Sequence, residues 1–127
     1  MKKFILFCLF ISSVFASEIK VLKNIEELKE NKNIFLMFST ESCPWCAKQV
    51  SILEDIQKEK KDLEIFKVND DTLVYKELLK KYSFVIKYYP TSYIVTKEDG
   101  NLNINYEFQG YQKKKNILAV LNDEDSF

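Results

Sequence analysis

The 127-residue chain contains no histidine, no arginine, only two glycines and only two prolines. Without histidine, imidazole general bases, Ser-His or Cys-His nucleophile pairs and histidine metal sites are all excluded. The scarcity of glycine and proline argues against a disordered or low-complexity chain. Because 46% of the residues are hydrophobic, an ordinary fraction for a globular protein, we expect one packed domain.

The first sixteen residues differ in composition from the rest. Lys2 and Lys3 precede an apolar run over residues 4–15. Val14 and Ala16 supply small residues at the third and first positions before the expected cleavage site. This layout predicts a secretory signal peptide over residues 1–16 that is cleaved after Ala16. A membrane anchor is the alternative, but a membrane span needs roughly 20 apolar residues and this run is shorter. We therefore expect an exported, periplasmic protein.

Removing this segment changes the charge and the cysteine count of the mature domain, residues 17–127. Loss of two of the 19 lysines leaves 17 against 19 acidic residues, a net charge of −2. That balance gives no electrostatic basis for binding nucleic acid. Of the three cysteines, Cys8 lies in the predicted signal peptide, so only Cys43 and Cys46 remain. Two cysteines are too few for a structural zinc site, and no metal is expected.

The remaining cysteines form one candidate disulfide in an exported protein. Because that bond would close only a short loop, it would constrain the unfolded chain little. A cross-link that serves stability usually joins distant segments. The spacing of Cys43 and Cys46 therefore favours a chemical role.

Hydrophobic patterns predict alternating strands and helices. Continuous or alternating apolar stretches predict strands at 18–22, 33–39, 63–69, 92–96 and 102–108. Helical spacing predicts helices at 24–30, after the cysteine pair, at 72–82 and at 112–121. Asp99-Gly100 predicts a hairpin turn between the last two strands. The order predicts an α/β fold with a central mixed sheet and helices on both faces.

This element order, with Cys43-Pro44-Trp45-Cys46 opening the helix after the strand at 33–39, resembles the thioredoxin superfamily. Tyr89-Pro90-Thr91, just before the next strand, is similar to the cis-proline segment of that family. Lys67 resembles the lysine that thioredoxins place under the active site, and Gly110-Tyr111 resembles a segment ahead of the last helix. The resemblance implies a thioredoxin fold and a redox-active disulfide as the only cofactor.

Two positions depart from the thioredoxin pattern. Pro44-Trp45 stands where thioredoxins have Gly-Pro, and Met37 stands where they carry a buried aspartate. Glutaredoxins share Cys-Pro-aromatic-Cys, but they carry paired glycines for glutathione, and here only Gly100 follows the proline strand. The overall likeness is to periplasmic thioredoxin-like proteins of sulfur-compound oxidation and related reductive pathways.

Disulfide exchange needs a thiolate attacker and a second thiol that resolves the mixed disulfide. Cys43 would lie at the helix N-terminus, where N–H groups and the dipole favour an anion, so we expect its pKa to fall below that of a free thiol. Cys46, one turn later on the apolar stripe, would be buried and attack second. Pro44 suits the first turn but removes a donor. Pro44 and Lys67 are therefore candidates for tuning the thiol pKa, although Lys67 also fits a solvated strand-end charge.

Four residues are candidates for binding the substrate. Trp45 would lie exposed beside the site and contact an apolar partner, or else pack partly against the domain. A cis peptide before Pro90 would leave Tyr89 backbone groups free to pair with an extended substrate, with Thr91 alongside. A trans proline at a strand start is the alternative for Pro90.

The sequence leaves three functions open. The first is a monomeric periplasmic reductase of protein disulfides, kept reduced by a membrane electron donor. The second is a dithiol oxidant that donates its disulfide; such oxidants often carry an extra helical insertion, for which this chain has no room. The third is a redox-inert binding module with the same fold, against which both cysteines argue. We therefore favour the reductase.

Overall fold

A computed structural model describes residues 19–123 of the chain. The signal peptide expected over residues 1–16 lies outside the described residues. None of the helices within residues 19–123 has the length and apolar character that crossing a membrane requires.

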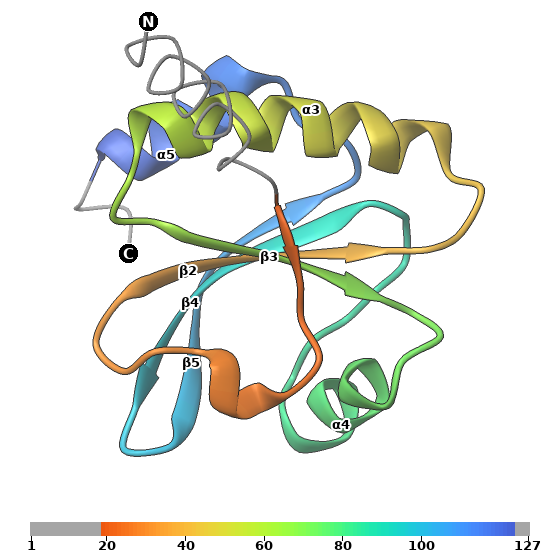
Figure 1. Cartoon of the computed structure of the whole chain (residues 1–127), viewed down its shortest axis with the longest axis vertical. Coiled ribbons are helices and arrows are strands. Elements are labelled where there is room, and N and C mark those ends of the chain that lie inside the picture. Colours follow the sequence, from red (N-terminus) through yellow and green to blue (C-terminus); the bar gives the residue numbers. More distant parts are fainter. Residues whose placement is uncertain (1–18, 124–127) are drawn as a thin grey trace, which may run out of the picture.

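A five-stranded mixed sheet forms the centre of the molecule, with the strand order β1-β3-β2-β4-β5 (Figure 1). β1 and β2 run parallel to β3, whereas β4 is antiparallel to both β2 and β5. The strands are β1 (Lys20–Val21), β2 (Asn33–Ser39), β3 (Glu64–Asn69), β4 (Thr91–Glu98) and β5 (Asn101–Gln109). The helical elements are the 3-10 turn η2 (Ile25–Glu27) and the α-helices α3 (Pro44–Glu59), α4 (Leu73–Lys81) and α5 (Lys114–Asn122).

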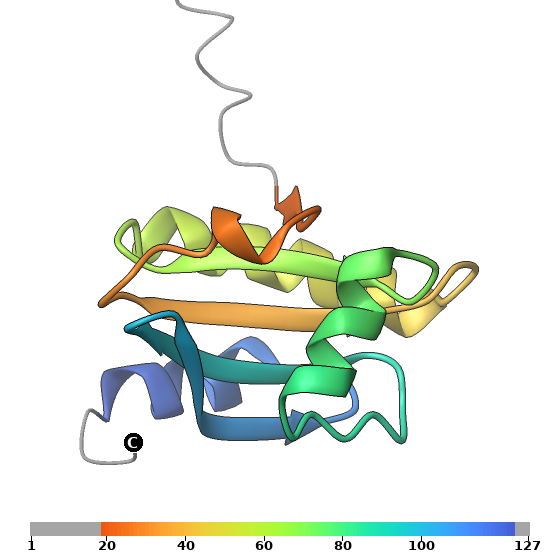
Figure 2. The ribbon, with the colours of Figure 1, turned by 90° about the horizontal axis from the view of Figure 1, so that it is seen from below.

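Helices cover both faces of the sheet. α3 and α5 lie over one face, and α4 and η2 lie over the other (Figures 1 and 2). The predicted α/β architecture is therefore confirmed.

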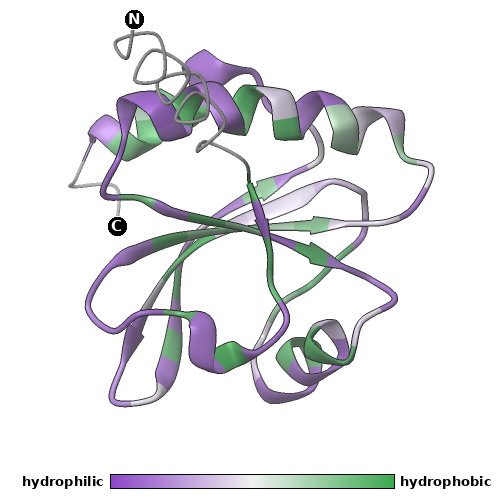
Figure 3. Cartoon of the chain, viewed as in Figure 1, coloured by the Kyte–Doolittle hydropathy of each residue, from purple (hydrophilic) through white to green (hydrophobic). Residues whose placement is uncertain are grey.

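The apolar run of β2 serves both layers. Ile34, Leu36 and Phe38 pack in the core on the α4 side, while Phe35 and Met37 pack in the core on the α3 side. Side chains alternate between the two faces of a strand, so a strand covered on both faces must be apolar at every position. Figure 3 shows hydrophobic residues in the middle of the sheet, and both hydrophobic and hydrophilic residues in the helices.

The helix predicted at 24–30 is wrong in length, because only the 3-10 turn Ile25–Glu27 forms. The backbone returns to an extended conformation at Leu28, whose side chain is buried in the core. Glu30 then pairs with Lys97 of β4, and the Asn31 N–H donates to the Lys97 carbonyl at 2.9 Å. Pairing with the sheet thus ends the turn.

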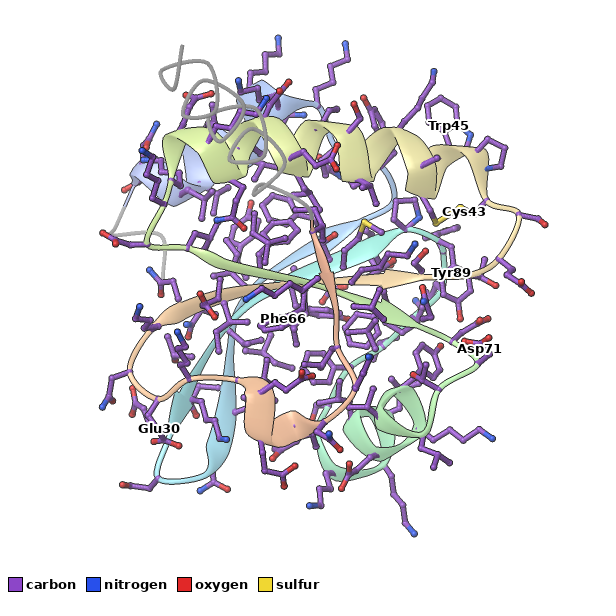
Figure 4. The ribbon with its side chains drawn as sticks, viewed as in Figure 1. Glu30, Cys43, Trp45, Phe66, Asp71 and Tyr89 are labelled. Carbon is purple, nitrogen blue, oxygen red and sulfur yellow. A yellow bond between two sulfur atoms is a disulfide. The ribbon has the colours of Figure 1, made fainter. Side chains whose placement is uncertain are left out.

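The hairpin between β4 and β5 turns at Asp99 and Gly100, as predicted. Both residues have left-handed backbones, with φ of 51° and 81°, which a two-residue turn of this hand requires. The Glu30 carboxylate accepts hydrogen bonds from the Asp99 and Gly100 N–H groups at 2.9 and 3.2 Å. Glu30 lies at the opposite end of the molecule from Cys43 (Figure 4).

Candidate active site

Cys43 is the residue that caps the N-terminus of α3. Its backbone is extended, and its Sγ accepts a hydrogen bond from the Cys46 N–H at 3.1 Å. Pro44 occupies the first turn, where its missing N–H leaves no donor unpaired. A thiolate at this position would be stabilised by the Cys46 N–H and by the positive end of the helix dipole.

Cys43 and Cys46 form a disulfide, with their Cα atoms 5.2 Å apart. Cys43 is half-buried, whereas Cys46 is only 4% exposed and packs in the core beside Met37 and Leu53. The two sulfurs therefore differ in access, and only Cys43 is open to another molecule. Cys43 is the cysteine that we expect to attack, and Cys46 is the one that we expect to resolve the mixed disulfide.

The loop before β4 faces Cys43. The Tyr89-Pro90 peptide bond is cis, and the Tyr89 carbonyl oxygen lies 3.8 Å from the Cys43 Sγ (Figure 4). Pro90 and Thr91 are buried, and the Thr91 hydroxyl donates to the Tyr88 carbonyl at 2.7 Å. The structure thus brings the predicted segment to the sulfur. In the dithiol form, the Tyr89 carbonyl can accept from a Cys43 thiol, so it opposes the effect of the Cys46 N–H.

The side chain of Tyr89 is tied to α4. Its hydroxyl lies 2.7 Å from that of Tyr75, whose ring packs edge-on against Phe38 with ring centroids 5.8 Å apart. Burial, followed by the hydrogen bond to Tyr75, raises the pKa of Tyr89 above its ordinary value. Tyr89 therefore stays neutral well into the alkaline range.

Trp45 lies beside the disulfide at the start of α3. Its side chain is 53% exposed, which fits the exposed orientation expected from the sequence. The centroids of the Tyr111 and Trp45 rings lie 5.2 Å apart. The Lys48 Nζ lies over the Trp45 ring, 4.7 Å from its centroid. An aromatic surface therefore lies beside Cys43. It is formed by the exposed Trp45 and the half-buried Tyr111 and is here called the aromatic ledge.

Three residues of neighbouring strands form a row beneath the N-terminus of α3. Met37 of β2 pairs with Lys67 of β3 and with Ser92 of β4, so all three side chains point to the α3 face. Met37 is completely buried and Lys67 is half-buried. The row contains a cation but no acid.

Lys67 also lines a pocket of about 640 Å³ that opens beside the disulfide. Cys43, Cys46 and the acidic residues Glu41 and Asp71 line the same pocket. A cation at this position favours a thiolate, while the two carboxylates disfavour it. Within residues 19–123, no three histidine, cysteine, aspartate or glutamate side chains are grouped as a metal site requires.

Two buried side chains hold the loops on either side of Cys43, and neither is among the site residues predicted from the sequence. Gln49 of α3 bonds to the backbone N–H and carbonyl of Gln112, and the Tyr93 hydroxyl bonds to both backbone groups of Val85. One signal for Gln49 is present in the sequence. It lies three residues after Cys46 and four before Leu53, so it is a polar residue within the apolar stripe of α3.

No family model matches the sequence, and no curated protein sequence matches it. Solved structures do match. An uncharacterized thioredoxin-like protein from Clostridium perfringens is 29% identical, with a TM-score of 0.68 over 87% of this chain and 85% of that one. Thioredoxin from Trichomonas vaginalis is 20% identical, with a TM-score of 0.64 over 84% and 97%. Thioredoxin f2 from Chlamydomonas reinhardtii is 18% identical, with a TM-score of 0.62 over 84% and 96%.

These likenesses establish the fold. The chain has a thioredoxin fold: a five-stranded mixed sheet with helices on both faces. Its disulfide joins two cysteines with C-x-x-C spacing at the start of a helix. Together, the fold and this disulfide support a thiol:disulfide oxidoreductase in general terms.

Proposed function

We propose that the chain is an exported thiol:disulfide oxidoreductase that reduces disulfides in periplasmic proteins. The observation that carries the proposal is the position of Cys43. Its half-buried sulfur caps α3, bonds to the buried Cys46 and faces the Tyr89 carbonyl. A sulfur placed this way is accessible, stabilised as a thiolate and adjacent to its resolving partner.

The reaction begins with the dithiol form. The Cys43 thiolate attacks one sulfur of a substrate disulfide, the substrate S–S bond breaks, and its other sulfur leaves as a thiolate that takes up a proton. Cys46 then gives up its proton, which the first leaving thiolate can take up, and the Cys46 thiolate attacks the Cys43 Sγ. The bond between Cys43 and the substrate breaks, the second substrate sulfur leaves as a thiolate that is protonated by solvent, and the Cys43–Cys46 disulfide forms. Two electrons pass to the substrate. A dithiol donor, here proposed to be a membrane protein, must reduce the disulfide again.

The substrate would lie across the loop that contains Tyr89 and Pro90. An extended polypeptide can pair with the backbone of Tyr89, and Thr91 supports this loop through its bond to the Tyr88 carbonyl. Trp45, on the other side of Cys43, offers an apolar surface. The chain is proposed to act as a monomer and to bind no nucleic acid.

A dithiol oxidant is the second candidate. Such oxidants often carry an extra helical insertion. Here the chain passes from β3 to β4 through α4 alone, without a further helix, and this supports the reducing direction. The export proposal rests on the basic and apolar residues of segment 1–16. Mass spectrometry of the protein recovered from the periplasm should show a chain that begins at Ser17.

Reduction of insulin by the wild type and by Cys43→Ser tests the proposal. The wild type should accelerate the reduction of insulin by dithiothreitol, and Cys43→Ser should not. Equal rates would contradict the oxidoreductase and favour a redox-inert binding module. The reduction potential tests the direction, because a value near about −120 mV, typical of a strong oxidant, would exclude the reductase. Alkylation of living cells should find Cys43 and Cys46 mainly as thiols.

A further inference from the structure

Gln49 is a completely buried amide on the inner face of α3. Its Nε2 donates to the Gln112 carbonyl at 3.1 Å, and its Oε1 accepts from the Gln112 N–H at 2.8 Å. A buried amide is costly unless it is paired, and here one side chain satisfies both backbone groups of one residue. The backbone at Gln112 is therefore fixed against α3.

This pair of hydrogen bonds fixes the residue that follows Tyr111. β5 ends at Gln109, Gly110 has a left-handed backbone with φ of 79°, and the Gln112 side chain donates to the Gln109 carbonyl at 3.2 Å. Tyr111 stands between the turn at Gly110 and the fixed backbone at Gln112. Its ring is thus held over the start of α3.

The partner of Tyr111 is on the same helix as Gln49. Trp45 precedes Gln49 by four residues, and its ring contacts Tyr111 with centroids 5.2 Å apart. Lys48 lies over the same ring, 4.7 Å from its centroid. One helix therefore carries the exposed ring of the aromatic ledge and the buried amide that fixes the backbone next to the other ring.

We propose that Gln49 is a positioning residue that pre-forms the aromatic ledge for substrates with an apolar or aromatic side chain beside their disulfide. The inference rests on the proposed function, since it assigns a substrate class to the same site. A ledge that is already in place binds such a side chain without the cost of ordering the loop. Large aromatic surfaces at the centre of an interface carry much of the binding energy.

Gln49→Leu tests the proposal, because it replaces the amide with an apolar side chain of similar size and so removes both hydrogen bonds to Gln112. Trp45 is the chain's one tryptophan, so its fluorescence reports directly on the ledge. The emission of Trp45 should change, and the KM for insulin should rise about tenfold, the equivalent of about 1.4 kcal/mol. We expect kcat to change much less than KM, since Gln49 touches neither sulfur.

Gln57→Leu is the matched control. Gln57 lies near the other end of α3, and its amide donates to the Leu63 carbonyl at 2.7 Å. The same substitution there should cost stability but leave the Trp45 emission and the KM as in the wild type. If both variants change emission and KM alike, a general loss of stability explains the effect and the proposal fails.

Gln49→Glu separates positioning from packing. A protonated carboxyl can donate to the Gln112 carbonyl and accept from its N–H, whereas a carboxylate has no proton to donate. The Trp45 emission of this variant should therefore match that of the wild type while the carboxyl is protonated and depart from it once the carboxyl ionises, at a pH above the ordinary range for glutamate because burial raises the pKa of a carboxyl. A difference from the wild type that is the same on both sides of that titration would overturn the proposal, and this readout needs no folded Gln49→Leu.

Tyr111→Ala completes the test. It removes the ring that Gln49 is proposed to hold, so Gln49→Leu should add little to the KM of this variant. Additive effects would overturn the link between the two residues. A wild type that does not reduce insulin would instead overturn the proposed function, while the fluorescence of the Gln49 variants would still report on the ledge.

Discussion

The hydroxyl groups of Tyr75 and Tyr89 lie 2.7 Å apart and join α4 to the loop that faces the disulfide. Through this pair, a helix on one face of the sheet is connected to the residue whose carbonyl lies 3.8 Å from the Cys43 Sγ. The opposite loop is held from the other face, by Gln49 of α3. The two layers of the fold thus each hold one side of the site.

Tyr75→Phe should lower the free energy of unfolding by about 1 kcal/mol, because it leaves the half-buried Tyr89 hydroxyl without its partner. Urea denaturation measures this difference. Tyr88→Phe is the control, since the Tyr88 side chain is 60% exposed and the described residues give its hydroxyl no hydrogen bond. Equal stability of the Tyr75 variant and the wild type would show that the hydroxyl pair contributes nothing.

The raised pKa of Tyr89 predicts a loss of stability at alkaline pH. Burial and the hydrogen bond to Tyr75 keep Tyr89 protonated in the folded state, whereas an unfolded tyrosine ionises near pH 10. Above about pH 10, the folded state therefore holds more protons than the unfolded state, and its stability falls as the pH rises. The difference in free energy of unfolding between the wild type and Tyr89→Phe should therefore shrink as the pH rises above about 10. A constant difference across the range would contradict the prediction.

Much of this fold could be predicted because local patterns determine it. The continuous apolar run gives β2 its bounds at Asn33 and Ser39, and the cysteine followed by proline marks the start of α3. Asp99-Gly100 identifies the hairpin, because few other pairs tolerate two left-handed residues. In each case, the physical cause lies within a few residues of the chain.

The loop contacts around the site could not be predicted in the same way. Gln49 and Gln112 are 63 residues apart, and a glutamine on a helix is ordinarily solvated. The Tyr75–Tyr89 pair depends on how α4 packs on the sheet, which periodicity does not determine. The short 3-10 turn at Ile25–Glu27 shows the same limit, since its end is decided by pairing with Lys97 of β4.

Cys46→Ser should trap a mixed disulfide between Cys43 and the substrate, and Cys43→Ser should trap none. Cys46 is 4% exposed, so it cannot reach a protein substrate, whereas Cys43 can. Non-reducing electrophoresis and mass spectrometry of the purified variants would detect the adduct. Adducts on Cys46 in the Cys43→Ser variant would reverse the proposed order of attack.

Lys67→Met should make the Cys43 thiol harder to ionise, because it removes the cation of the pocket that both residues line. The ultraviolet absorbance of the thiolate should then titrate at a higher pH than in the wild type. Lys32→Met, an exposed position just before β2, is the control and should leave the titration unchanged. An unchanged titration in Lys67→Met would show that Lys67 does not act on the Cys43 thiol.

Ser92→Ala should make the protein more stable. Ser92 is 1% exposed between Met37 and Phe108, and within residues 19–123 its hydroxyl is a buried group without a hydrogen-bond partner. An unpaired buried hydroxyl costs about 1–3 kcal/mol, so its removal should raise the free energy of unfolding by about 1 kcal/mol. The neighbouring Thr91→Val should act in the opposite direction, since it removes a hydroxyl that donates to the Tyr88 carbonyl at 2.7 Å. Thermal unfolding of the two variants compares them directly, and a lower melting temperature for Ser92→Ala would show that the Ser92 hydroxyl is paired in solution.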